Sequence, residues 1–236
     1  MPLPPGRKRR VKAPPGRPLT VDLIVDTALQ LLVSEGLDAI SMRKVAKEFD
    51  TGPASLYAHV SDKDELLELL LDKIAGQVTL PEPDPDRWQE QLKDLAREIR
   101  KVWGEHKDIA RAFVGRFPVG PNQLRVADTL LGVLRAGRIP PKVAVYAVDV
   151  LGRYVNAETL ASTGPAFQVE PGKDPERSAQ EYTARIADYL RALPPQRYPH
   201  IVDMVDQLLG QDSDQRFEFG LNLLVQSFAS YAGKED

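Results

Sequence analysis

Cysteine is absent from this chain of 236 residues, and histidine occurs only three times, at His59, His106 and His200. The lack of cysteine excludes disulfide bonds and thiolate metal sites. Three histidines so far apart do not have the spacing of a metal site, so we expect neither a metal nor another cofactor. Paired catalytic carboxylates, a Ser/His/Asp arrangement and a glycine-rich phosphate loop are also missing, which argues against an enzyme.

Long apolar stretches are missing as well, because no run reaches the ~18 uncharged apolar residues that a membrane span requires. The basic N-terminus has no apolar segment behind it, which argues against a signal peptide. Hydrophobic residues make up 42% of the chain and charged residues 28%, which is typical of a soluble globular protein. We therefore expect a cytoplasmic protein with no membrane contact.

Charge is distributed unevenly along the sequence. The first 20 residues contain six basic side chains and no acidic one, although the net charge of the whole chain is −3. The same segment is rich in proline and cannot bury a core, so residues 1–18 are predicted to form a disordered basic arm. A cationic arm on an acidic body favours a DNA contact at one end of the molecule.

Apolar residues recur with helical spacing, and no convincing period-two alternation is present, which predicts an all-α protein with about ten helices. Thr20 is expected to cap the first helix and Gly36 to end it. Ser61 with Asp64, and Asp86 with Gln89, are read as further capping pairs. The expected helices span about 21–35, 42–49, 53–59, 62–78, 87–103, 106–114, 121–136, 141–163, 177–192, 199–209 and 213–232.

Residues 80–86, LPEPDPD, contain three prolines and interrupt the helical pattern. We place a domain boundary here, between an N-terminal domain of residues 19–79 and a larger helical domain of residues 80–236. The N-terminal domain has three short helices, of which the second and third are joined by a tight turn with Gly52. This arrangement is typical of a helix-turn-helix, a motif that places one helix in the major groove of DNA.

The residues of the third helix suit that task. Ala54 and Ser55 are small enough to approach base edges, while Leu56 and Val60 supply an apolar anchor. The side chains of Tyr57 and His59 can hydrogen-bond to phosphate, and Lys63 begins the next helix, where backbone N–H groups also favour phosphate.

The run from Leu19 to Leu70 resembles the DNA-binding domain of the TetR family of transcriptional regulators. The matching features are ALQLLVSEG, SMRKVA, the recognition unit GPASLYAHV and KDELL. More loosely, VYAVDVLGRYVNAE and RFEFGLNLLVQSF resemble the C-terminal domain of tetracycline-repressor-like members. The resemblance implies a dimeric regulator, most often a repressor, that releases operator DNA when a small molecule binds its C-terminal domain.

The resemblance also assigns roles to residues. It implies phosphate contacts by Tyr57 and Lys63, contacts from the second helix by Ser41 and Arg43, and base reading by Pro53, Ala54 and Ser55. Pro53 lacks the side-chain donor that several relatives have there, which favours apolar and shape readout. Arg17 is expected to reach into the minor groove, as arms of homeodomains do.

Other roles remain open for several of these residues. Tyr57 can pack the edge of the small domain, Lys63 can be a solvated charge, and Arg43 can pair with Glu48 or Asp50. His59 can cap its own helix instead of binding phosphate.

The C-terminal domain offers only general candidates for an effector site, because aromatic residues at helical spacing are often plain core. Asp149, Arg153 and Asn156 share one helix face, which is either a recognition set or a solvated stripe with an ion pair. His106 is either a helix cap or a donor in the pocket. The predicted effector-binding residues are His106, Phe113, Phe117, Tyr146, Arg153, Asn156 and Phe167.

The last helix is apolar over much of its circumference, so it is either deeply buried or pairs with a second subunit. The resemblance implies the second alternative, a homodimer in which helices 141–163 and 213–232 of both subunits form a four-helix interface. Such a two-fold contact matches a palindromic operator. A regulator without a small-molecule effector, controlled by a protein partner, is the alternative reading.

Overall fold

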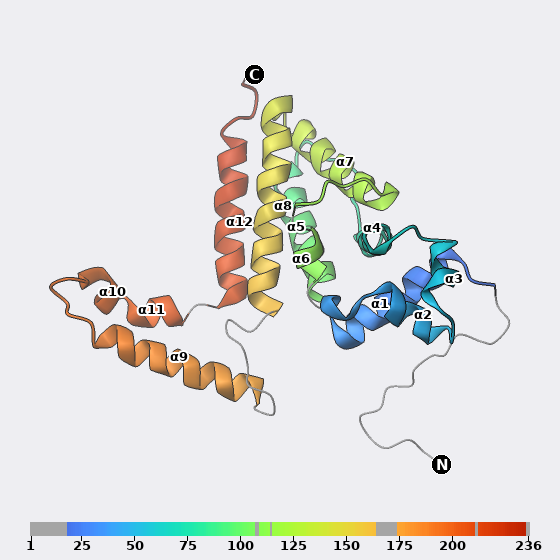
Figure 1. Ribbon diagram of the computed structural model, residues 1–236. Coiled ribbons are helices and arrows are strands. Elements are labelled where there is room, and N and C mark those ends of the chain that lie inside the picture. The colour runs from blue at the N-terminus through green and yellow to red at the C-terminus, as the bar shows by residue number, and fades with distance from the viewer. Residues whose placement is uncertain (1–17, 107–108, 114, 164–173, 211, 235–236) are drawn as a thin grey trace, which may run out of the picture.

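The computed structural model describes residues 18–106, 109–113, 115–163, 174–210 and 212–234 (Figure 1). Within these ranges the chain forms twelve α-helices, one short 3-10 helix and no β-strand, which confirms the expected all-α fold. The number exceeds the expected one partly because residues 199–209 form two helices that meet at Met204 instead of one.

The N-terminal helices begin and end largely where local sequence signals place them. The side chain of Thr20 accepts a hydrogen bond from the Leu23 N–H, and that of Ser41 accepts one from the Lys44 N–H. Gly36 ends the first helix with a φ of 88°, a conformation that glycine adopts without strain. The helices are α1 (Val21–Glu35), the 3-10 helix η1 (Leu37–Ala39), α2 (Met42–Glu48), α3 (Pro53–Tyr57) and α4 (Lys63–Ala75).

The start of α4 corrects the capping pair expected from Ser61 and Asp64. Asp62 is the N-cap, and its carboxylate accepts a hydrogen bond from the Glu65 N–H at 2.8 Å. The Glu65 carboxylate in turn accepts one from the Ser61 N–H. Both registers of this segment, Ser61–Asp64 and Asp62–Glu65, place an acidic residue three positions after a possible N-cap, so spacing alone does not distinguish them.

The C-terminal domain is built around α5, whose apolar side chains Leu92, Leu95, Ile99 and Val102 are buried. This helix packs against α7, α8 and α12 and also contacts α4 and α6, while α8 and α12 lie side by side over most of their length (Figure 1). The helices are α5 (Trp88–Gly104), α6 (Ile109–Phe113), α7 (Pro121–Ala136), α8 (Pro141–Thr163) and α12 (Ser213–Ala229).

The proline-rich segment before α5 is held by Gln91 and not by the expected Asp86–Gln89 cap. Gln91 accepts a hydrogen bond from the Asp84 N–H at 2.8 Å and donates one to the Glu82 carbonyl at 2.7 Å. Arg87 precedes α5 without a side-chain cap. The amide of Gln91 thus binds a turn that comes before it in sequence, a contact that helix-capping rules do not predict.

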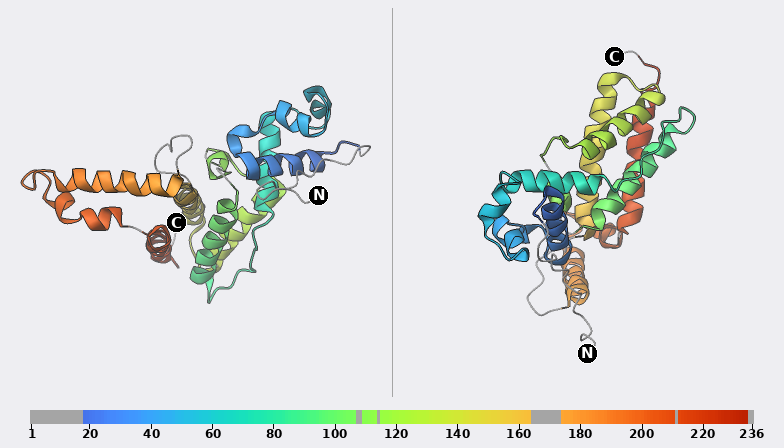
Figure 2. Two further views of the ribbon diagram at one scale, coloured as in Figure 1. Left: turned by 90° about the horizontal axis from the view of Figure 1, so that it is seen from below. Right: turned by 90° about the vertical axis from the view of Figure 1, so that its right-hand side faces the viewer.

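The remaining helices form an arm that projects from this body. It comprises α9 (Pro175–Arg191), α10 (Pro199–Asp203) and α11 (Val205–Leu209), and α9 packs against the other two. Figures 1 and 2 show that the arm and the N-terminal helices extend to opposite sides of the α8–α12 pair.

Candidate DNA interface and effector site

The turn between α2 and α3 gives the short third helix its position. Asp50 adopts a φ of 52°, a left-handed conformation that aspartate tolerates better than most residues. Gly52 then precedes α3, and Pro53 occupies the first helical position, where its missing N–H costs little. On the inner side, Leu56 and Val60 are buried in the core with residues of α2. The apolar anchor expected from the sequence is therefore present.

The residues predicted to meet DNA lie opposite this anchor, at the surface. The Tyr57 side chain is 52% exposed. Pro53 is half-buried, and the other members of the set are exposed; they are Ser41, Arg43, Ala54, Ser55, His59 and Lys63. Arg17 lies outside the described residues. The chain thus exposes most of these residues between the start of α2 and the start of α4.

Two alternatives for this surface find no support in the contacts. Among the described residues Arg43 forms no ion pair with Glu48 or Asp50, and the ring of His59 caps no helix. Ser55 is engaged instead, since its hydroxyl lies 2.8 Å from that of Thr51. Arg43, His59 and Lys63 therefore keep their donors directed to solvent within the described part of the chain.

In the C-terminal domain, three of the predicted effector residues gather around Trp103, at the end of α5. The indole stacks on Phe113 with ring centroids 4.4 Å apart and donates a hydrogen bond to the Asn156 side-chain oxygen at 3.0 Å. His106 follows shortly after Trp103 in the sequence. Its side chain is buried, and its Nδ1 lies 2.8 Å from the Val102 carbonyl oxygen. Trp103 was absent from the sequence-based set, although a tryptophan near His106 was a usable signal.

The structure does not bring the other predicted effector residues to this place. Phe117 is 81% exposed after α6, and Tyr146 is 59% exposed on α8. Arg153 is also exposed and pairs with Asp149 at 3.0 Å, as the solvated-stripe alternative expected. Phe167 lies outside the described residues. Helical spacing places Tyr146 and Arg153 on α8 but does not tell which face of that helix is covered.

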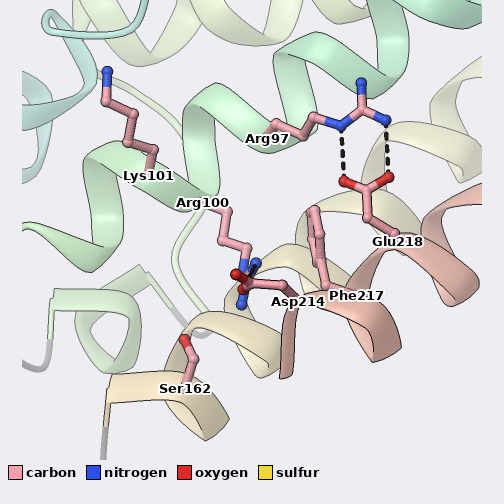
Figure 3. Close-up of a pocket in the computed structure, with 7 residues that line it drawn as sticks. All are labelled: Arg97, Arg100, Lys101, Ser162, Asp214, Phe217 and Glu218. Carbon is pink, nitrogen blue, oxygen red and sulfur yellow. Dashed lines mark hydrogen bonds and ion pairs between the residues drawn. The ribbon is translucent and has the colours of Figure 1, made fainter. Parts of the chain in front are cut away.

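A pocket of about 330 Å³ opens between α5, α8 and α12 (Figure 3). Arg97 donates two hydrogen bonds of 2.8 Å to the Glu218 carboxylate. Arg100 lies 4.5 Å from the centre of the Phe217 ring and pairs with Asp214 at 2.8 Å. The charges that line the pocket are therefore mostly neutralised within the chain, which favours a role in joining α5 to α12.

The electrostatics of this junction shift the pKa values of several groups, including Glu218 and Tyr154. The hydrogen bond from Arg97 holds the pKa of the Glu218 carboxyl below its usual range. Burial raises the pKa of the Tyr154 hydroxyl, which donates a hydrogen bond to the Phe217 carbonyl at 2.8 Å. The hydrogen bonds from Arg97 to the Glu218 carboxylate and from Tyr154 to the Phe217 carbonyl attach α12 to the body.

Apolar side chains are exposed along the outer face of α8 and α12. They belong to two helices that lie side by side, and their exposed fractions exceed two fifths. The members of this face are Val145, Tyr146, Val150, Phe219 and Leu223. A contiguous apolar face of this kind marks a protein interface more often than an ordinary surface.

The described residues hold neither a metal-binding cluster nor a membrane span. No group of three or more His, Asp or Glu side chains there is arranged to hold a metal ion. None of the described helices combines the length and apolarity that crossing a membrane demands.

Comparison with known proteins agrees with this geometry. Residues 24–70 match the family model of bacterial regulatory proteins of the tetR family, and residues 80–229 match that of the tetracyclin repressor-like C-terminal domain. An HTH-type transcriptional regulator of Saccharopolyspora erythraea is 32% identical over 217 residues, covering 92% of this chain and 87% of the relative.

The repressor DrrR1 of Streptomyces coeruleorubidus is 29% identical over 219 residues, covering 92% of this chain and 80% of the relative. The crystal structure of ActR from Streptomyces coelicolor in complex with actinorhodin superimposes with a TM-score of 0.83 at 39% identity, covering 92% of this chain and 98% of that one. Since one family model alone spans residues 80–229, the chain belongs to the tetR family of bacterial regulatory proteins.

Proposed function

We propose that this protein is a transcriptional repressor that binds a palindromic operator as a homodimer and leaves it when a small molecule binds the C-terminal domain. It acts in the cytoplasm by binding and not by catalysis. The proposal rests most directly on the exposed polar surface from Ser41 to Lys63, which is held by the buried anchor of Leu56 and Val60. We take residues 1–18 as a basic arm, 19–79 as the DNA-binding domain and 80–236 as the effector domain.

Each part of the DNA interface has its own task in this proposal. Ala54 and Ser55 approach base edges, where Pro53 adds apolar contact and shape readout. Ser41, Arg43, Tyr57, His59 and Lys63 donate hydrogen bonds to phosphate, which fixes the register of the helix in the major groove. Arg17 enters the adjacent minor groove.

The two-fold symmetry of the operator requires two copies of this interface. We assign the apolar face of α8 and α12 to the dimer contact, because no other described helices leave so many large apolar side chains side by side at the surface. The contact places two recognition helices in successive major grooves, roughly 34–36 Å apart. In this proposal Tyr146 belongs to the apolar face and Arg153 is an exposed residue of the same helix, and neither is part of the effector site.

The effector site is proposed around Trp103, where Phe113, Asn156 and His106 supply a second aromatic ring and polar atoms. Sites of this kind combine apolar walls with a few fixed polar groups. ActR, which is similar to this chain, has been crystallised with actinorhodin and with (S)-DNPA. By linkage, an effector lowers operator affinity by the same factor by which DNA lowers effector affinity.

The test has two steps and begins with the purified protein. Duplexes that it retains are selected from random DNA, and the release of the selected duplex is then measured with actinorhodin as the first probe. We expect enrichment of a palindrome and its release by actinorhodin or by a related aromatic compound. Failure to enrich any DNA sequence contradicts the DNA-binding part of the proposal. If the protein retains the selected duplex in the presence of every compound tested, control by a protein partner is favoured instead.

A further inference from the structure

Helix α7 begins without a capping side chain of its own. Its N-cap is Gly120, and the backbone N–H groups of the following turn have no partner within the helix. A carboxylate from another helix supplies that partner. Oδ1 of Asp72, on α4, accepts hydrogen bonds from the N–H groups of Asn122 at 2.8 Å and Gln123 at 3.0 Å.

A third hydrogen bond joins the same two helices, since the Asn122 side-chain amide donates to Oδ2 of Asp72 at 2.9 Å. Two N–H groups at the second and third positions of a helix are those that an N-cap side chain normally binds. The negative charge of Asp72 also lies at the positive end of the α7 dipole. Asp72 therefore caps α7 from a position fifty residues earlier in the chain.

The approach of the two helices depends on glycine. A Cβ atom at Gly120 would lie 2.2 Å from Oδ1 of Asp72, far inside van der Waals contact. Any other residue at this N-cap would have to displace the Asp72 side chain from its capping position or move α4 away from α7. The capping contact thus requires both the carboxylate on α4 and the missing side chain on α7.

The next residue of α4 contacts α1 instead of the body. Lys73 forms an ion pair with Asp26 of α1, inside the DNA-binding domain. Near the other end of α4, Arg116 of the body pairs with Asp64 at 2.8 Å. The adjacent residues Asp72 and Lys73 therefore connect the same turn of α4 to α7 of the body and to α1 of the DNA-binding domain.

We propose that Asp72 is a positioning residue that fixes the orientation of the DNA-binding domain relative to the effector domain. It does so by capping α7 and so holding α4 at one point of the body. Movement of α7 then moves α4 and, through the Lys73–Asp26 pair, α1. This inference rests on the proposed function, because in a homodimer the distance between the two DNA-binding domains sets operator affinity.

The experiment measures that orientation directly and needs no effector. Because the chain has no native cysteine, Ala58→Cys and Gln89→Cys introduce one spin label on each domain. Both positions are exposed. Labelled protein is diluted with unlabelled protein so that any dimer carries one labelled copy, and the distance distribution is recorded by pulsed electron paramagnetic resonance.

Four variants in this background separate positioning from plain stabilisation. Asp72→Ala removes the carboxylate, and Gly120→Ala disturbs the contact from the other side. Asp72→Asn keeps an oxygen that accepts both backbone bonds and serves as the rescue. Asp214→Ala is the matched control, since it removes an aspartate contact that joins α5 and α12 inside the body.

We expect a narrow distribution for the unchanged protein, Asp72→Asn and Asp214→Ala, and a broadened or shifted one for Asp72→Ala and Gly120→Ala. Operator binding, measured for Asp72→Ala and Gly120→Ala in the chain without the added cysteines, should weaken by about tenfold, the equivalent of one lost helix cap. Unchanged distributions in the variants that fold would overturn the inference. Failure of the unchanged protein to bind any operator would instead overturn the proposed function and leave the distance result standing.

Discussion

The indole N–H of Trp103 donates a 3.0 Å hydrogen bond to the side-chain oxygen of Asn156 and so joins the end of α5 to the middle of α8. Trp103 is buried, and its ring stacks on Phe113 of α6. Three helices of the effector domain therefore meet at one aromatic side chain. A ligand that binds there has to rearrange a contact on which the packing of the body depends.

Removal of the acceptor should be costly because it leaves a buried donor without a partner. We predict that Asn156→Ala lowers the free energy of unfolding by about 1–3 kcal/mol. Asn222→Ala is the matched control, since Asn222 donates only to the Glu218 carbonyl of its own helix. Urea denaturation of both variants checks the difference, and equal midpoints for Asn156→Ala and Asn222→Ala would refute the prediction.

A charge on the apolar face of α8 and α12 should separate the subunits. Leu223→Lys places an ammonium group in the proposed contact, where it cannot be hydrated once two copies meet. Sedimentation equilibrium is expected to give twice the chain mass of 26.2 kDa for the unchanged protein and the single mass for the variant. Phe117→Lys, at an exposed apolar residue of another surface, should remain dimeric. A dimeric Leu223→Lys variant would show that the subunits meet at a different surface.

The ion pair of Arg97 and Glu218 should make stability depend on pH in one direction. The hydrogen bond from Arg97 lowers the pKa of Glu218 from its ordinary value of 4.5, so the pair stabilises the fold above that pH and is lost as the pH falls further. Both side chains are 39% exposed, which limits the contribution to about 1 kcal/mol.

The comparison of Glu218→Gln with the unchanged protein tests this sign. We expect the variant to be less stable at pH 7 and the difference to shrink in acid below the ordinary pKa of glutamate. Glu90→Gln removes a more exposed carboxylate of an i,i+3 pair and should change stability little. A difference that grows in acid would contradict the assignment.

The basic arm should contribute to DNA affinity through phosphate contacts. Deletion of residues 1–18 is predicted to reduce the slope of log affinity against log salt by about 0.9 for each lost contact. Fluorescence anisotropy titrations at several salt concentrations measure that slope. An unchanged slope after the deletion would show that Arg17 and its neighbours remain in solution.

Local signals were enough to predict much of this fold. Thr20 and Ser41 cap α1 and α2 through hydrogen bonds to residues three positions later, and Pro53 occupies the first position of α3. Short stretches of sequence are therefore enough to predict where these helices begin. The apolar anchor at Leu56 and Val60 follows from spacing for the same reason. Ser61 and Asp62 are each followed three positions later by an acidic residue, so spacing alone did not show which of them caps α4; the folded structure shows that it is Asp62.

Contacts between distant segments could not be predicted in this way. Asp72 caps a helix fifty residues later, and no pattern in either segment indicates the other. Helical spacing also could not show which face of α8 is covered, so Tyr146 and Arg153 were grouped with Asn156. Trp103 was missed because its spacing on α5 fits an ordinary core residue.

The central claim is that the surface from Ser41 to Lys63 holds DNA, and substitution of two of its residues tests it most directly. The double variant Tyr57→Ala, Lys63→Ala is compared with Lys142→Ala, an exposed lysine of the C-terminal domain, for binding to the selected operator. The account predicts a large loss of affinity for the double variant, at unchanged fold and subunit mass, and almost none for the control. Full retention of DNA by the double variant would contradict it.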